Sequence, residues 1–246
     1  MKVSIITVTF NSENTVNDTL LSIQGQDYGN IEHIIIDGAS KDKTLDIVKS
    51  YKHVTKIISE QDKGIYDAMN KGLRLATGDI IGILNSDDFY SSNQIISQIV
   101  NCFNENRTDT VYGDLEYVDS KNTDKVVRTW LSGNYKKKNF YYGWMPPHPT
   151  FFVRKELYLK YGMFNTNFKM AADYEFMLRL LFKNNISTSY LSKIIVKMRV
   201  GGLSNSNLKN RLRANNEDSK AWKINNLKPK FYTFLLKPTL KIKQYF

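Results

Sequence analysis

The residues of this chain with the most potential for chemistry are short clusters of carboxylates, amides and hydroxyls that follow apolar stretches. The clearest cluster is Asn85-Ser86-Asp87-Asp88, which comes directly after the apolar run 80–84. A strand end fixes the backbone, and carboxylates there can hold Mg²⁺ or Mn²⁺ together with diphosphate oxygens. The same four residues also suit an Asx-rich turn that leads into a helix, so the cluster alone leaves both interpretations open.

A second cluster places a carboxylate at the end of another apolar run. Asp37 follows residues 31–36 and precedes Gly38 and Ser40. A carboxylate at a strand end, beside small residues, can accept hydrogen bonds from a ribose or a base edge. The alternative is an ordinary strand-to-helix turn in which Asp42 caps the next helix, and the residues alone favour that alternative.

A third cluster, residues 59–72, combines polar side chains and Gly64 ahead of a predicted helix. The N-terminus of a helix attracts phosphate through its free N–H groups and its dipole. The segment matches neither a P-loop nor the G-x-G-x-x-G fingerprint, and neither pattern follows the first apolar run. The sequence therefore does not predict a P-loop ATPase or a dinucleotide-dependent dehydrogenase.

The second half of the chain offers a candidate general base and a candidate metal ligand. Asp173 begins an amphipathic helix and could project into a cleft as a base. Glu175 is explained by the preference of acids for the first turn of a helix. His148 stands among prolines 146, 147 and 149, which restrict its backbone. It could bind a metal or a diphosphate, although the residue alone favours an ordinary histidine in a surface loop.

Alternating strands and helices must position these residues. Apolar runs predict strands at 3–10, 31–36, 57–58 and 80–84, with helices between them. This alternation predicts a parallel sheet with helices on both faces, in which ligands bind beyond the carboxyl ends of the strands. Later segments are less regular, with strands predicted at 111–112, 126–128, 150–153 and 189–198 and a helix from about Tyr174.

Composition narrows the class of protein. The 246 residues are 41% hydrophobic and carry a formal net charge of +11. The basic balance suggests an anionic partner: a nucleic acid, a phosphorylated substrate or an anionic membrane. No run reaches the roughly 20 apolar residues of a membrane-spanning helix, and no signal peptide is expected. The single cysteine, Cys102, fits a buried thiol in a reducing compartment.

The order and spacing of these clusters resemble the family 2 glycosyltransferases with a GT-A fold. The closest resemblance is to the subgroup from bacterial exopolysaccharide, capsule and O-antigen clusters, and it covers about residues 1–200. It is carried by Thr7-Val8-Thr9-Phe10-Asn11, Ile36-Asp37-Gly38-Ala39-Ser40, Asp62-Lys63-Gly64-Ile65-Tyr66-Asp67-Ala68-Met69-Asn70-Lys71-Gly72, Asn85-Ser86-Asp87-Asp88 and Ala172-Asp173.

Two positions depart from the family pattern. Asn85 replaces the first Asp of the metal-binding DxD, so a metal would depend mainly on Asp87. Ala172 replaces the Glu of the usual Glu-Asp pair, which leaves Asp173 as the base. The QxxRW motif of processive synthases is absent from the sequence, so we expect transfer of one sugar per encounter.

The resemblance implies an α/β fold of the GT-A type, with a Rossmann-like, mostly parallel sheet and helices on both faces. We expect a glycosyltransferase domain at 1–205, divided into a nucleotide-sugar half (1–110) and an acceptor half (111–205). A basic, amphipathic helical extension would follow at 206–246. The resemblance also implies an inverting single displacement with a divalent cofactor, Mn²⁺ or Mg²⁺.

Individual site roles follow from the same resemblance. Asp173 is the expected general base, and Asp87 is the expected metal ligand, with help from Asp88 or His148. The donor, expected to be a UDP-sugar, would contact a set of loop residues at the strand and helix ends. That set is Thr9, Asn11, Asp37, Asp62, Lys63, Gly64, Asn70, Asn85 and Ser86.

The expected acceptor is an oligosaccharide on a polyprenyl diphosphate at the inner face of the bacterial cell membrane. Lysines 136–138 and the tail lysines 237, 241 and 243 lie among aromatic or apolar residues, as in segments that bind an anionic bilayer. We therefore expect a cytoplasmic enzyme attached peripherally through its tail. In the alternative, the tail packs on its own domain or supports a homodimer.

Three other functions compete with this one. A nucleic-acid-binding module would explain the charge but not the acidic clusters, so we expect no nucleic-acid partner. A nucleotidyltransferase would use a metal on a related sheet. A catalytically silent nucleotide-sugar-binding protein is compatible with the two departures from the family pattern.

Overall fold

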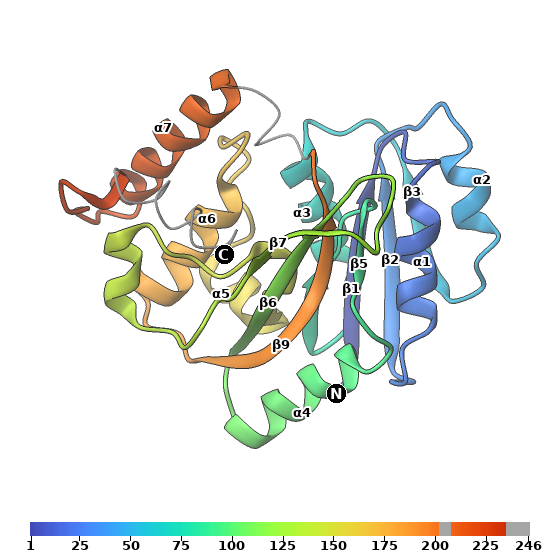
Figure 1. Ribbon diagram of the computed structural model, residues 1–246, viewed down its shortest axis with the longest axis horizontal. Helices are drawn as coiled ribbons and strands as arrows, with labels where there is room; N and C mark the ends of the chain where they lie inside the picture. Colours follow the sequence, from blue (N-terminus) through green and yellow to red (C-terminus); the bar gives the residue numbers. More distant parts are fainter. Residues whose placement is uncertain (202–207, 235–246) are drawn as a thin grey trace.

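Nine strands form one mixed sheet in the computed structural model, which describes residues 1–201 and 208–234 (Figure 1). The strands are β1 (Val3–Thr9), β2 (Ile31–Asp37), β3 (Val54–Ser59), β4 (Ile80–Ile83), β5 (Asp88–Tyr90), β6 (Thr110–Val118), β7 (Val126–Trp130), β8 (Phe152–Arg154) and β9 (Thr188–Arg199). Their order across the sheet is β3-β2-β1-β4-β8-β6-β9-β5, and β7 pairs with β6 beside this path.

The first half of the chain forms the parallel part of the sheet. β2 pairs parallel with β3 and with β1, and β1 pairs parallel with β4. Successive side chains of a strand point to opposite faces, and both faces of β2 are covered. Ile34 and Ile36 pack in the cluster that holds α3 (Ile65–Leu75), whereas Ile35 packs with α1 (Val16–Gln24) and α2 (Thr44–Lys49). This burial on both faces explains the continuous apolar runs and confirms the predicted α/β fold.

The second half of the sheet is mainly antiparallel. β8 pairs antiparallel with β4 and β6, β7 with β6, and β5 with β9, while β6 and β9 are parallel. The short strand β5 was not predicted, because three residues that include Asp88 give no apolar run. The helix α4 (Ile95–Asn106) follows it and holds Cys102, which is 7% exposed as the sequence led us to expect.

The remaining helices gather at the end of the sheet away from α1 and α2 (Figure 1). They are α5 (Lys155–Tyr161), α6 (Ala172–Met177), α7 (Leu208–Ile224), the 3₁₀ helices η1 (Lys137–Tyr142) and η2 (His148–Thr150), and the π-helix η3 (Leu178–Lys183). Within residues 1–201 and 208–234, no helix is both long and apolar enough to cross a membrane.

The C-terminal helix α7 packs against the main domain. The Trp222 side chain is fully buried in the large core cluster, beside the Phe182 ring with centroids 4.9 Å apart. The helix α7 therefore packs on the core through Ala221 and Trp222, in agreement with the alternative that the tail packs on its own domain. The tail lysines 237, 241 and 243 lie outside the described residues.

Candidate active site

The loops after β1, β2 and β4 converge at the carboxyl ends of these strands. Thr9 and Asp37 are register partners, and the Gly38 N–H donates to the Thr9 carbonyl at 2.9 Å. The loop after β1 contacts the loop after β4 through the Ser12 and Ser86 hydroxyls, 2.9 Å apart. The structure thus brings together three of the clusters that the sequence singled out, because parallel strands end at the same edge.

Asp37 is fully buried, and its carboxylate orders the loop that follows it. Asp37 Oδ2 accepts hydrogen bonds from the Ser40 N–H at 3.0 Å and the Ser59 hydroxyl at 2.6 Å, and Oδ1 accepts the Ser40 hydroxyl. The Asn11 N–H donates to the same Ser40 hydroxyl at 2.8 Å. In this structure the Asp37 carboxylate therefore shapes the loop through hydrogen bonds within the protein.

Two other predicted donor residues lie at the same edge. Asn11 adopts a positive φ of 48°, and its side-chain oxygen accepts the Lys41 N–H at 2.9 Å. Thr9 is 5% exposed, and its hydroxyl oxygen has no hydrogen-bond partner in the described part of the chain. A buried hydroxyl without a partner is costly, so Thr9 has hydrogen-bonding capacity available for a ligand.

The segment before α3 touches the loop after β2. Asp62 Oδ1 accepts the Gly64 N–H at 2.9 Å, and Gly64 has a φ of 118° that favours glycine. A Cβ on Gly38 would lie 2.8 Å from Asp62 Oδ2, so the two segments are in close contact. Lys63 is exposed beside them. Asp62, Lys63 and Gly64 therefore border the same edge of the sheet, as predicted.

Asn70 does not fit the predicted donor-binding role. It is 5% exposed, and its amide forms two hydrogen bonds with the backbone of Phe164: Nδ2 donates to the carbonyl at 2.8 Å, and Oδ1 accepts the N–H at 3.0 Å. These bonds fasten α3 to the segment before α6. Asn70 of the 62–72 motif thus connects two segments that border the site.

The carboxylates of Asp87 and Asp88 occupy different environments. Asp87 is partly exposed, whereas Asp88 is fully buried at the start of β5, on the same side of the strand as the buried Tyr90. Burial and the neighbouring Asp87 raise the pKa of Asp88 well above its usual value. Neither Asp88 oxygen accepts a well-formed hydrogen bond from the described residues, although Asn85 and Arg199 lie close enough to oppose this shift. Such a buried carboxyl, which favours its protonated form, is a poor ligand for a metal ion that also binds a solvent-accessible diphosphate.

A residue at the end of β9, Arg199, fixes the backbone at Asp87. Arg199 donates to the Asp87 carbonyl at 2.7 Å and forms an ion pair with Asp18, so it fixes the loop between β4 and β5. Burial raises the pKa of Asp87 above its usual value, and the charges of Arg199 and His148 only partly oppose this increase. His148 is therefore close enough to Asp87 to interact with its charge. No sequence pattern pointed to Arg199.

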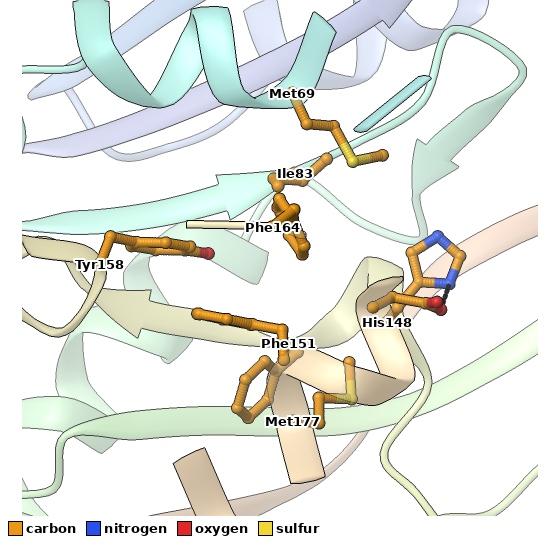
Figure 2. Close-up of a pocket in the computed structure, with 9 residues that line it drawn as sticks. Met69, Ile83, His148, Phe151, Tyr158, Phe164 and Met177 are labelled. Carbon is orange, nitrogen blue, oxygen red and sulfur yellow. Dashed lines mark ion pairs between the residues drawn. The ribbon is translucent and has the colours of Figure 1, made fainter. Parts of the chain in front are cut away.

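Asp173 lies between Tyr66 and His148. Its Oδ1 accepts the Tyr66 hydroxyl at 3.0 Å, and its Oδ2 is 3.5 Å from His148 Nδ1. Figure 2 shows His148 at one end of a small pocket, with the ion pair drawn as a dashed line. The side chains of Asp173 and His148 are 19% and 29% exposed, so both are accessible to a substrate.

The floor of this pocket is apolar. Phe151, Tyr158 and Phe164 extend away from His148, with Met69, Ile83 and Met177 around them (Figure 2). Burial and the Asp173 carboxylate raise the pKa of Tyr66 well above its usual value, so Tyr66 stays protonated and its hydroxyl donates a hydrogen bond to Asp173. The role of Tyr66 was not predicted, although the residue stands in the 62–72 motif.

Two of the predicted metal ligands suit a divalent cation. In the described part of the chain, no group of three or more His, Cys, Asp or Glu side chains is close enough to hold a metal. His148 lies within range of the Asp87 charge, and both side chains are partly exposed and of the oxygen and nitrogen types that Mn²⁺ accepts. They fit as two protein ligands that a diphosphate and water would complete. Asp88 does not fit as a third.

Comparison with known proteins agrees with this architecture. The family model described as "Glycosyl transferase family 2" matches residues 4–162. A "PGL/p-HBAD biosynthesis glycosyltransferase" from Mycobacterium bovis is 30% identical over 209 residues, which cover 82% of this chain and 79% of that protein. An uncharacterized glycosyltransferase from Mycobacterium tuberculosis is 32% identical over 186 residues, covering 72% of this chain and 68% of the relative.

Solved structures share the fold at lower identity. S. aureus TarS 1–349 superposes with a TM-score of 0.71 and 20% identity, covering 99% of this chain and 72% of that one. This chain spans 43% of a longer TarS structure. The mannosyltransferase PcManGT from Pyrobaculum calidifontis gives a TM-score of 0.67 and 18% identity, covering 99% and 69% of the two chains. The family match and the relatives show that the chain belongs to glycosyltransferase family 2, and its architecture and structural neighbours show that it has the GT-A fold.

Proposed function

We propose that this chain is an inverting enzyme that transfers one sugar from a UDP-sugar to a hydroxyl of a growing, lipid-linked surface-polysaccharide unit. The transferred group would be a hexosyl or N-acetylhexosaminyl residue. The observation that carries the proposal is the contact of Asp173 with Tyr66 and His148, with His148 also within range of the Asp87 charge. This arrangement supports a base and a metal ligand near each other, which would suit a metal-assisted single displacement.

Asp173 is the proposed general base. The acceptor oxygen forms a bond to the anomeric carbon while the bond from that carbon to the diphosphate breaks, and Asp173 takes the hydroxyl proton. Tyr66 and His148 hold the two oxygens of Asp173, which supports a fixed orientation of the carboxylate. Orientation of this kind is a large part of catalysis in a displacement.

Asp87 and His148 would hold a divalent cation, Mn²⁺ or Mg²⁺. When bound, the cation would neutralise the negative charge that develops on the departing diphosphate. Thr9 and Lys63 would contact the nucleoside and diphosphate, in the loop framework that Asp37 shapes. TarS has been solved with UDP-GlcNAc and with UDP, and PcManGT with GDP-Man and Mn²⁺, which supports a nucleotide-sugar donor here.

A thermal-shift experiment tests the donor and the metal together. UDP, GDP, UDP-N-acetylglucosamine, UDP-glucose and GDP-mannose would be added with and without Mn²⁺ to the wild-type chain, Asp87→Ala and Asp88→Asn. We expect a Mn²⁺-dependent rise in Tm with one nucleotide, which is lost in Asp87→Ala and kept in Asp88→Asn.

The outcomes separate the competing functions. An equal Mn²⁺-dependent rise in Asp87→Ala would refute the metal role of that residue. No rise with any nucleotide would count against a transferase and would lead next to titration with a random oligonucleotide. Release of UDP or GDP from one of these donors would exclude a silent binding protein.

A further inference from the structure

The helix that carries Asp173 has no cap of its own. α6 begins at Ala172, and its N-cap position is Ala171, whose methyl side chain cannot accept a hydrogen bond. Residues 169–171, which lead into the helix, also carry backbone N–H groups that need acceptors. The segment 169–171 just before α6 therefore depends on another part of the molecule.

Glu217 of α7 supplies these acceptors. Its Oε2 accepts the backbone N–H groups of Lys169 at 3.0 Å, Met170 at 2.8 Å and Ala171 at 3.0 Å, and its Oε1 accepts that of Lys169 at 3.1 Å. The Glu217 side chain is 12% exposed, so the interaction is largely shielded from water. A carboxylate near the N-terminus of a helix is also favoured by the helix dipole.

Two more residues of the C-terminal segment hold α6 on the other side of Asp173. Trp222 Nε1 donates to the Tyr174 hydroxyl at 2.8 Å, and Asn225 Nδ2 donates to Glu175 Oε1 at 2.9 Å. Trp222 is fully buried and Asn225 is 3% exposed. Asp173 thus lies between two places at which the C-terminal segment is attached: the Glu217 contacts before α6, and the Trp222 and Asn225 contacts after Asp173. Figure 1 shows α6 next to α7.

We propose that Glu217 is a positioning residue for Asp173. It fixes the backbone of residues 169–171, and through them the direction in which α6 presents the Asp173 carboxylate toward Tyr66 and His148. The inference rests on the proposed role of Asp173 as the base. It gives the C-terminal helix a catalytic purpose that is separate from membrane attachment.

Glu217→Ala and Glu217→Gln in the full chain test this inference. The alanine removes every acceptor, whereas the glutamine keeps one carbonyl oxygen that can occupy the Oε2 position and accept the same three N–H groups. Asn216→Ala, at an exposed neighbour on α7, is the matched control. The readouts are kcat and KM for UDP release from UDP-N-acetylglucosamine, UDP-glucose and GDP-mannose (GDP in the last case), and amide hydrogen exchange of residues 169–177.

We expect Glu217→Ala to lower kcat by roughly 10- to 100-fold with little change in KM for the donor, because a small displacement of the base slows the reaction without removing donor contacts. Amide exchange of residues 169–177 should rise in the same variant. Glu217→Gln should recover most of the loss, and Asn216→Ala should behave as the wild type.

The contradicting results are distinct. Unchanged amide exchange in Glu217→Ala would show that Glu217 does not hold the segment. Raised exchange with an unchanged kcat would show that the segment does not position the base. An active Asp173→Asn variant, measured in parallel, would overturn the base assignment and this inference with it, whereas an inactive one leaves the Glu217 result to decide.

Discussion

Asp173 lies where three segments far apart in the sequence meet. Tyr66 comes from α3, His148 from η2 and Asp173 from α6, and the Tyr66–Asp173 hydrogen bond joins residues 107 positions apart. The carboxylate is partly exposed, so it can both accept a hydrogen bond from Tyr66 and receive a proton from a substrate. This combination separates Asp173 from the buried Glu175 two positions later.

Asp173→Asn should abolish most turnover and leave donor binding intact. The amide keeps the size of the side chain and an oxygen for Tyr66, but it cannot take a proton, and general-base catalysis contributes about 10²- to 10⁴-fold. Steady-state release of the nucleotide and the donor-dependent Tm shift measure the two properties. Glu105→Gln, on the exposed side of α4, is the control, and wild-type turnover in Asp173→Asn would disprove the assignment.

Glu32 is a buried carboxylate outside the site that makes stability depend on pH. Burial alone would raise its pKa, but hydrogen bonds from Ser4, Thr77 and Lys2 lower it to about 2. Its pKa is thus lower in the folded state than the ordinary value of 4.5. The stabilisation is therefore present above about pH 4.5 and is lost as the pH falls toward 2.

Glu32→Gln should accordingly destabilise the protein at pH 7 by roughly 2 kcal/mol, and by much less at pH 3. Urea unfolding of the wild type and the variant at both values measures the difference. A difference in the free energy of unfolding between the two proteins that is the same at both pH values would contradict the role of the Glu32 charge.

At the scale of elements, α3 and β1 approach each other unusually closely. A Cβ on Gly72 would lie 2.4 Å from the Ile6 Cγ2 atom, so the helix can pack at this distance only with glycine there. Gly72 ends the family-like 62–72 motif. The close packing brings Tyr66, on the same helix, into position for Asp173.

Gly72→Ala tests this packing. Alanine favours a helix by about 1 kcal/mol over glycine, but overpacking of a core typically costs about 1–3 kcal/mol. We expect the clash to dominate, so that the free energy of unfolding falls by about 1–2 kcal/mol. Chemical denaturation measures it, with the exposed Arg74→Ala in the same helix as control. A stabilised Gly72→Ala variant would show that the helix can move away from β1.

At the scale of the whole molecule, the structure joins two basic segments that are distant in the sequence. The ring of Tyr142, beside the exposed lysines 136–138, stacks on that of Tyr232 with centroids 5.6 Å apart. Lys228 and Lys230 are exposed next to Tyr232, and the Phe231 side chain is 89% exposed. Exposed aromatic and basic side chains together suit the surface of an anionic bilayer, which supports the proposed site of action at the membrane.

The triple variant Phe231→Ala, Lys228→Ala, Lys230→Ala should float less with vesicles of phosphatidylglycerol and phosphatidylcholine than the wild type does. Each lysine contributes about 1 kcal/mol near an anionic surface, so we expect a loss of at least roughly tenfold in partitioning. Vesicles of phosphatidylcholine alone are the control for charge. Equal flotation of both proteins would rule out this patch as the attachment site.

The fold class and the edge of the sheet at which the site lies follow from the amino-acid sequence alone. Both depend on local patterns: apolar runs report strands buried on both faces, and polar residues directly after them must lie at strand ends. The clusters around Asp37, Asp62 and Asp87 could therefore be located from these patterns. Asp173 is a candidate base on the sequence alone, because the spacing of the clusters resembles that of a known family.

Which of these side chains face a ligand depends on the tertiary structure. Asp87 and Asp88 are adjacent in the sequence, but Asp87 lies partly exposed in the turn before β5, whereas Asp88 begins the strand and is buried with Tyr90 on one of its sides. Asn70 stands inside the motif yet bonds the backbone of Phe164, and Glu217 holds the start of α6 from 46 residues beyond Ala171. Such contacts depend on how distant elements pack, which no local pattern specifies.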